Sequence, residues 1–217
     1  MKRIWIFTML ICLAVFFCGG AECKEYVVFG HYEQDVCMEN GKEPVEWIVL
    51  EEKDDSVLLI SRYALETKPF HEEWTDVSWE ECSLRAWLND TFFRDAFSAE
   101  EQARILTVNG DNVFLLSVDE AEQYFSADRD RIVIATEAAI RNGAFVVDEI
   151  NTYVFDTEEQ PLPLNACWWW LRSNGETPDS AARVDADGYV FTFGQRVSEE
   201  ECCVRPCICV KLMEGVR

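Results

Sequence analysis

The sequence is poor in histidine, with only His31 and His71 among its 217 residues. Nucleophilic catalysis by serine or cysteine needs a base close to the nucleophile, and that base is usually a histidine. Neither histidine lies in a Gly-x-Ser-x-Gly segment or in a cysteine–histidine protease motif. We therefore interpret both as ordinary surface or turn residues, and the sequence does not predict a hydrolase of this kind.

Basic residues are also scarce. The chain has 19 lysines and arginines against 41 aspartates and glutamates, which gives a net charge of −22 at pH 7. Such a surface repels phosphate backbones, so we expect no nucleic-acid partner. The excess of acid is compatible with divalent cations, although solubility is the commoner reason for it. With so many carboxylates, no glycosidase pair can be singled out.

The apolar run at the N-terminus is too short for a membrane helix, which needs roughly 20 residues. It extends from Ile4 to Phe17, after the positive stretch Met1–Arg3 and before the small residues Gly19 and Ala21. This order is typical of a signal peptide that is cleaved after Ala21.

We therefore expect residues 1–21 to be a signal peptide and residues 22–217 to form a single domain, since no linker, repeat or low-complexity tract divides them. The mature protein would be secreted or held in the cell envelope, with no membrane span. Two alternatives are a retained membrane anchor and a lipoprotein acylated at Cys18. The bulky neighbours Phe16 and Phe17 disfavour acylation.

The ten cysteines include no Cys-x-x-Cys pair, so the spacing of a zinc knuckle is absent. Two of them lie in the predicted leader, and an even number in the remaining exported chain favours disulfides. A thiolate metal site is the alternative, and the pairing stays open. The disulfide candidates are Cys23, Cys37, Cys82, Cys167, Cys202, Cys203, Cys207 and Cys209.

The order of the expected elements indicates an α+β fold. Residues 45–50 and 57–61 predict a β-hairpin whose second strand is apolar enough to be buried on both faces. Three Ser-x-x-Glu capping boxes, which begin helices, occur at Ser78–Glu81, Ser98–Glu101 and Ser117–Glu120. Strands return in the last third of the chain. We expect strands from the two ends of the chain to form a sheet, with the helices in the middle.

Nine different short segments follow one another along the chain: Gly30-x-Tyr32-x-Gln34, Pro44–Leu50, Leu59–Leu65, Ser83–Asn89, Phe114–Ala121, Trp169–Ser173, Val184–Gly188, Gly194–Val197 and Val204–Pro206. In this order they resemble an uncharacterised bacterial family, the domain of unknown function numbered 6273. The resemblance covers nearly all of the mature chain and implies no activity, because none is established for the family. The chain departs from the family pattern at Asn174-Gly175 and at Cys207. We therefore transfer no disulfide pattern of the family to the extra cysteines.

More distantly, the C-terminal segments are similar to C-type-lectin-like domains, including the branch of the formylglycine-generating enzymes. That resemblance implies an early hairpin, central helices, a late tryptophan-rich strand and a final strand that returns beside the first. It is an analogy of fold, and fold does not carry function.

One segment is similar to the start of a calcium loop. Asp185-x-Asp187-Gly188 places oxygen ligands on alternate residues, but Arg196 stands where an EF-hand has its twelfth-position glutamate. The alternative interpretation is an Asp-Gly hairpin turn between two strands. We expect no cofactor, with calcium at Asp185 and Asp187 as the alternative.

Three consecutive tryptophans, residues 168–170, lie on an expected strand, so their side chains alternate between its two faces. Either the middle ring or the outer pair then faces away from one core, where aromatic rings are common contact surfaces. Helices that cover both faces are the alternative. The candidate ligand-binding residues are Trp168, Trp170, Arg172 and Asn174.

These features predict a non-catalytic, secreted or envelope-associated recognition domain whose partner is a glycan or a protein. Its ligand would be held by the loops from Asn174 to Ala181 and around Gly194. One alternative is an oxidoreductase-type enzyme related to the formylglycine-generating branch, with a reactive pair among the late cysteines. Another is a purely structural envelope component. Arg172 and Arg205 could instead be structural arginines buried against carboxylates.

Overall fold

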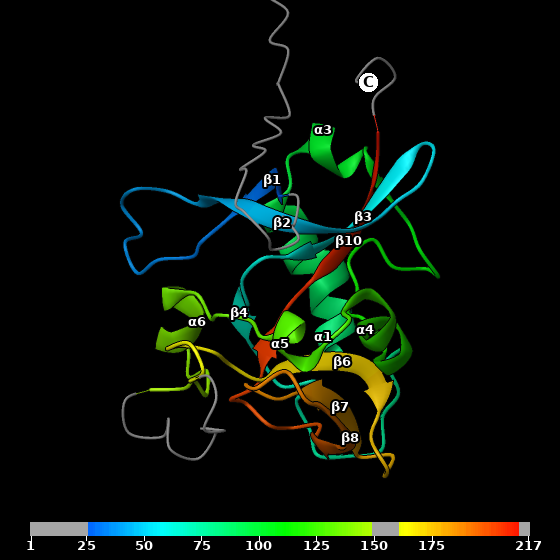
Figure 1. The fold of residues 1–217 in the computed structure, drawn as a ribbon. Helices are drawn as coiled ribbons and strands as arrows, with labels where there is room; N and C mark the ends of the chain where they lie inside the picture. Colours follow the sequence, from blue (N-terminus) through cyan, green and yellow to red (C-terminus); the bar gives the residue numbers. More distant parts are fainter. Residues whose placement is uncertain (1–25, 149–160, 213–217) are drawn as a thin grey trace, which may run out of the picture.

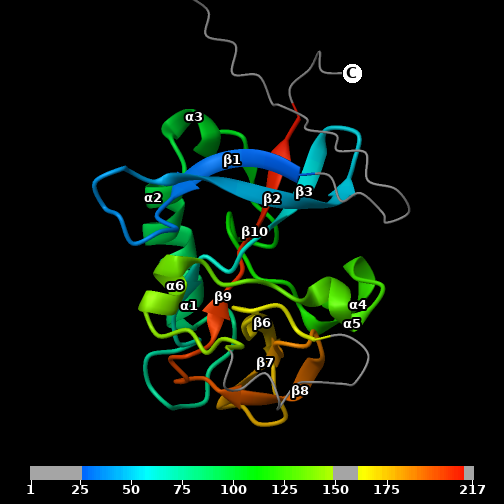
Figure 2. The same ribbon diagram turned by 60° about the vertical axis from the view of Figure 1, so that its left-hand side comes forward.

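The computed structural model describes residues 26–148 and 161–212. The predicted signal peptide and Cys23 lie outside these ranges. Two five-stranded sheets stand at opposite ends of the molecule, and most of the helices lie between them, whereas α3 (Ala99–Gln102) lies on the outer side of the first sheet (Figures 1 and 2). Helices and strands are therefore both present, as the predicted α+β class requires.

The first sheet joins the two ends of the described chain. Its strand order is β1-β2-β3-β10-β5, with β1 at Tyr26–Tyr32, β2 at Glu43–Glu52, β3 at Ser56–Ser61, β10 at Cys207–Lys211 and β5 at Ile105–Leu106. The predicted hairpin is confirmed as β2 and β3, which pair antiparallel. β3 is central and almost wholly buried, as its apolar run predicts. The last strand, β10, lies beside β3 and not beside β1.

The second sheet carries the tryptophan-rich segment. Its order is β4-β9-β6-β7-β8, with β4 at Glu66–Thr67, β9 at Cys203–Val204, β6 at Trp169–Asn174, β7 at Ser180–Val184 and β8 at Val190–Arg196. β6 runs parallel to β9 and antiparallel to β7. The predicted Asp-Gly turn joins β7 to β8, and there the Gly188 N–H donates to the Asp185 carbonyl at 2.9 Å.

The helices are short. They are α1 at Ser83–Trp87, the π-helical segment η1 at Leu88–Phe92, α2 at Phe93–Ala96, α3 at Ala99–Gln102, α4 at Val118–Tyr124, α5 at Asp128–Arg131 and α6 at Glu137–Arg141. In the described parts of the chain, none is long and apolar enough to cross a membrane.

Two of the three predicted capping boxes are confirmed, at Ser98 for α3 and Ser117 for α4. The box at Ser78 is wrong. The helix that follows begins later, and the thiol of Cys82 caps it by accepting from the Arg85 N–H at 3.3 Å. Cysteine is a weak acceptor and is not a usual N-cap residue.

The predicted disulfides do not form among the described residues, because no two of their cysteines lie at bonding distance. Most of these thiols are small apolar parts of the core instead. Burial raises the pKa of Cys82 to about 11 and that of Cys167 and Cys202 well above its usual value. The free cysteines are Cys37, which is exposed, Cys209, which is half-buried, and the buried Cys82, Cys167, Cys202, Cys203 and Cys207.

Candidate ligand-binding pocket

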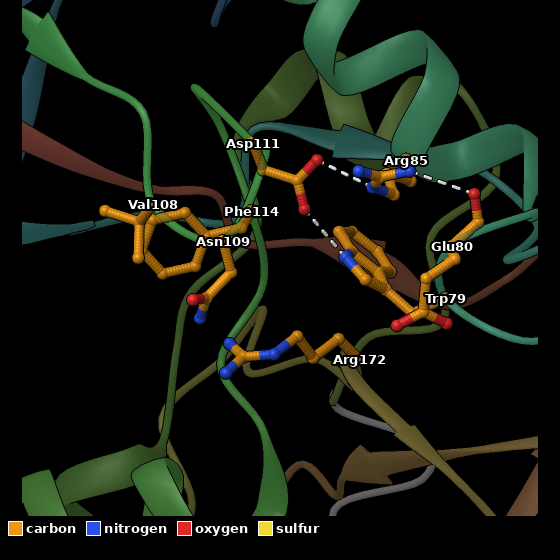
Figure 3. A pocket seen from close by; sticks show the side chains of 8 residues that line it. All are labelled: Trp79, Glu80, Arg85, Val108, Asn109, Asp111, Phe114 and Arg172. Atoms are coloured by element: carbon orange, nitrogen blue, oxygen red, sulfur yellow. Dashed lines mark hydrogen bonds and ion pairs between the residues drawn. The ribbon is translucent and has the colours of Figure 1, made fainter.

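A small cavity opens where three segments that are distant in the sequence come together (Figure 3). Its volume is about 280 Å³, near the lower limit for small-molecule sites. The segment around α1, a turn at residues 108–111 and strand β6 each contribute side chains. The lining residues are Trp79, Glu80, Arg85, Val108, Asn109, Asp111, Phe114 and Arg172.

One wall of the pocket is built around the buried carboxylate of Asp111. The Trp79 indole Nε1–H donates to its Oδ2 at 2.9 Å, and Arg85 Nε donates to its Oδ1 at 2.6 Å. Arg85 also donates from Nη1 to the Glu80 carbonyl at 2.9 Å. Because charge-assisted hydrogen bonds are strong where water is excluded, this wall is held in one arrangement.

Asp111 itself is delivered by a tight turn. Val108 and Asp111 exchange backbone hydrogen bonds of 2.8 and 3.0 Å, and the two residues between them have positive φ angles, 51° at Asn109 and 93° at Gly110. Two such residues define a type I′ turn, for which Asn-Gly is the favoured pair. The turn therefore places the Asn109 amide at the mouth of the pocket and Asp111 inside it.

Asn89 of η1 fastens this turn to the helix. Its Nδ2 donates to the carbonyl of Arg85 at 3.1 Å and to that of Val113 at 2.9 Å. Its Oδ1 accepts from the Asn112 N–H at 2.7 Å. One amide side chain thus links the helix that carries Arg85 to the turn that carries Asp111.

Arg172 enters the pocket from β6 and is fixed by two partners. Its Nη1 and Nη2 donate to the two carboxylate oxygens of Glu120 at 2.6 and 2.7 Å, and Nη1 also donates to the Leu115 carbonyl at 2.6 Å. Glu120 is the capping residue of α4, where it also accepts from the Ser117 N–H. Arg172 is therefore both a pocket residue and an arginine paired with a carboxylate.

The charges around the pocket are nearly balanced, with a small excess of acid. Hydrogen bonds from its own backbone N–H and from the Ser78 hydroxyl lower the pKa of Glu80, and Arg85 and Arg172 add to the effect. The ionised Glu80 joins Asp111 and Glu120, so three carboxylates face two guanidinium groups. Neither a histidine nor a cysteine is among the lining residues, so the site offers hydrogen bonds and an aromatic edge rather than a nucleophile.

The tryptophans expected to contact a ligand lie elsewhere. Trp169 and Trp170 are fully buried, and their indole N–H groups donate to the carbonyls of Arg131 and Lys68 at 3.1 and 2.9 Å. Trp168 is half-buried and stacks on Phe145, with ring centroids 4.2 Å apart. Both faces of the strand are thus covered, which is the alternative that the sequence left open.

Of the other candidate residues, only Arg172 lines the pocket. Asn174 is exposed at the end of β6. Arg205 is fully buried, as expected of a structural arginine, but it donates to the carbonyls of Ser61 and Arg131 at 3.0 and 3.2 Å. Desolvation lowers its pKa to about 10.

The two residues proposed for calcium are engaged in the β7–β8 turn. Asp185 Oδ1 accepts from Arg183 Nε at 2.8 Å, and Asp187 Oδ1 accepts from the Tyr189 N–H at 3.0 Å. Burial raises the pKa of Asp185 although Arg183 opposes the shift. These contacts favour the hairpin interpretation, and calcium at Asp185 and Asp187 stays a prediction.

A second group of carboxylates was not indicated by the sequence. Oxygens of Glu33, Asp35 and Glu43 lie within 4.8 Å of one another, and no cysteine belongs to such a group within the described ranges. Desolvation and the nearby Glu43 and Asp35 raise the pKa of Glu33. The thiolate metal site considered as an alternative to disulfides is therefore not supported among the described cysteines.

Comparisons with known proteins agree with the family resemblance of the sequence. Residues 54–212, which include every residue that lines the pocket, match the domain of unknown function DUF6273. No curated protein and no solved structure matches the chain. The chain belongs to the DUF6273 family.

Proposed function

We propose that this protein is a secreted or envelope-associated recognition domain, without catalytic activity, that binds one sugar ring of a glycan in the pocket. The observation that carries the proposal is the arrangement of Arg85, Asp111 and Arg172 around the indole of Trp79. The lectin-like architecture expected from the sequence belongs to the same proposal.

The pocket suits a sugar in both size and chemistry. A cavity of about 280 Å³ is too small for an extended ligand and is comparable with one ring. Arg172, Asn109 and Glu80 offer donors and acceptors for hydroxyl groups, while Trp79 and Phe114 offer aromatic surface. Because the arginines are already held by carboxylates, little side-chain entropy is lost when a ligand binds.

The charges favour an uncharged sugar over an acidic one. Both guanidinium groups are already paired, Arg85 with Asp111 and Arg172 with Glu120. An incoming carboxylate would compete with these partners and would be repelled by Glu80, whose pKa is lowered. We therefore expect neutral glycans to be preferred.

The oxidoreductase-type alternative has less support. A reactive cysteine is an accessible group of low pKa, whereas Cys202, Cys203 and Cys207 are buried. Burial raises the pKa of Cys202 and Cys207. Thiol labelling of the folded protein tests this alternative, because rapid labelling of a late cysteine would support it.

The test of the proposal is a glycan array followed by calorimetric titration of the best neutral glycan. Asn109→Gly removes the amide at the pocket mouth and keeps a residue that accepts the positive φ angle. We expect it to lower affinity about tenfold, which corresponds to the loss of one or two hydrogen bonds.

Asn174→Ala is the matched control, because it removes an exposed amide from the loops first expected to hold the ligand. Its affinity should equal that of the unmodified protein. The proposal fails if Asn109→Gly binds as tightly as the unmodified chain. It also fails if no glycan binds, the result that a purely structural envelope protein predicts.

A further inference from the structure

Trp74 is a large apolar side chain that stays 60% exposed. It lies in the segment between β4 and α1, and this segment is pinned at both ends. The His71 N–H donates to the Val197 carbonyl at 2.8 Å, and the Val77 N–H donates to the Pro178 carbonyl at 3.0 Å. Trp74 is thus held against the late loops, and it is not among the residues that line the pocket.

Two further contacts fix the Trp74 ring itself. Its Nε1–H donates to Asp179 Oδ2 at 2.6 Å, and the guanidinium carbon of Arg196 lies 4.2 Å from the ring centroid. Hydrogen bonds from the Thr177 hydroxyl and from Trp74 lower the pKa of Asp179, so this acceptor stays ionised. An exposed aromatic side chain locked in one orientation is typical of a binding hot spot.

The late loops that Trp74 contacts approach each other closely at two glycines. A Cβ atom on Gly175 would lie 2.7 Å from the Cα of Gly194, and Gly194 has a φ of +87°. The Glu176 N–H donates to the carbonyl of Phe193 at 2.9 Å, and Phe193 is 59% exposed. Phe193 is thus a second exposed aromatic residue of β8, the strand that carries Arg196.

The charge of this surface is negative. Exposed or half-buried acids in the same segments are Glu72, Glu73, Asp76, Glu176 and Asp179, while Arg196 is the basic residue that contacts the ring. The chain as a whole carries −22. Such a surface attracts cations, and the indole already holds one guanidinium on its face.

We propose that this surface, formed by Trp74 and the surrounding acids, docks a basic segment of a partner protein. Lysine or arginine side chains of the segment would lie against the Trp74 ring and among the carboxylates. A neutral glycan would gain nothing from the acidic surroundings, so a protein partner is favoured here. This site is separate from the pocket and does not depend on the proposed glycan binding.

The test uses the full mature chain and a fluorescent arginine-rich octapeptide, with anisotropy as the readout. Trp74→Ala should weaken binding about threefold to fivefold. Tyr189→Ala is the matched control, since Tyr189 is also an exposed aromatic residue, 51% exposed, at the opposite end of the β7–β8 hairpin. It should leave the affinity unchanged.

A charge-matched pair of variants separates this surface from the net charge of the chain. Glu72→Gln with Glu73→Gln removes two charges beside Trp74, whereas Glu52→Gln with Asp54→Asn removes two exposed charges at the β2–β3 turn. The first should weaken peptide binding by about twofold or more, and the second should not. Added salt should weaken the binding of the unmodified chain.

The proposal is overturned if Trp74→Ala binds the peptide like the unmodified chain, if both charge pairs act equally, or if no peptide binds at low salt. It is also overturned if a neutral glycan, and not the peptide, requires Trp74. Asn109→Gly should bind the peptide normally, so failure of the pocket proposal would leave this result unaffected.

Discussion

The tryptophans of β6 and the tryptophans between β4 and α1 are held in different ways. In β6 the indole N–H groups of Trp169 and Trp170 donate to neutral backbone carbonyls. Trp74 and Trp79 donate instead to the carboxylates of Asp179 and Asp111. A charged acceptor is costly to bury without a partner, and each of these carboxylates lies beside an arginine.

The comparison shows which tryptophans mark a surface. A run of tryptophans on a central strand is covered on both faces, and its rings serve the core. Single tryptophans in the acidic segment reach carboxylates instead, one buried at Asp111 and one open to water at Asp179. In this strongly acidic chain, the pairing of an indole with a carboxylate thus marks both candidate binding sites.

The largest effect should come from the core tryptophans. Trp170→Ala removes a fully buried ring and should lower the free energy of unfolding by about 4 kcal/mol. Trp74→Ala removes an exposed ring and should cost about 0.5 kcal/mol. Urea denaturation measures both values. Equal losses would show that Trp74 is part of the core and would remove the contrast.

The next largest effect is expected at the two carboxylates that accept from indoles, Asp111 and Asp179. Asp111→Asn keeps the shape but weakens the bonds to Arg85 and Trp79, and we expect a loss of about 2 kcal/mol in the free energy of unfolding. Asp179→Asn should cost clearly less than Asp111→Asn, because its pair with Trp74 is open to water. The same denaturation experiment applies. A larger loss at Asp179 would contradict the assignment of Asp111 as the rigid centre of the pocket.

Alkaline pH should weaken the core through the Cys82 thiol. Burial raises the pKa of the Cys82 thiol from 9.0 to about 11. The unfolded thiol ionises first, so its contribution to stability is present below pH 9 and is lost as the pH rises toward 11. Cys82→Ser keeps a helix cap that does not ionise in this range.

Denaturation curves between pH 8.5 and 10.5 check this expectation. The Cys82→Ser variant should lose about 2 kcal/mol less than the unmodified protein over that interval. Parallel pH profiles for the two proteins would mean that the Cys82 thiol is not protected from ionisation by the fold.

Features with local signals were predictable from the sequence. A capping box needs only residues three apart, and the boxes at Ser98 and Ser117 are confirmed. The β2–β3 hairpin likewise follows from two apolar runs around a polar turn. At Ser78 the hydroxyl hydrogen-bonds Glu80 instead, and the helix begins later.

The pocket was only partly predictable, because its walls come from segments near residues 79–85, 108–114 and 172. The Asn109-Gly110 pair did carry a local turn signal. Nothing in the sequence places Asp111 between Trp79 and Arg85, since that contact exists only after folding. The prediction of disulfides was wrong for the same reason. An even number of cysteines does not say which of them lie close together, and most of the described thiols are packed in the core.

The central claim is that a neutral glycan binds beside Trp79. Its most direct test is a titration followed by the indole N–H signals in a proton–nitrogen correlation spectrum, assigned with single Trp→Phe variants. The Trp79 signal should shift with added glycan, and those of Trp169 and Trp170 should stay in place. A shift at Trp168 or Trp74 with none at Trp79 would contradict the account.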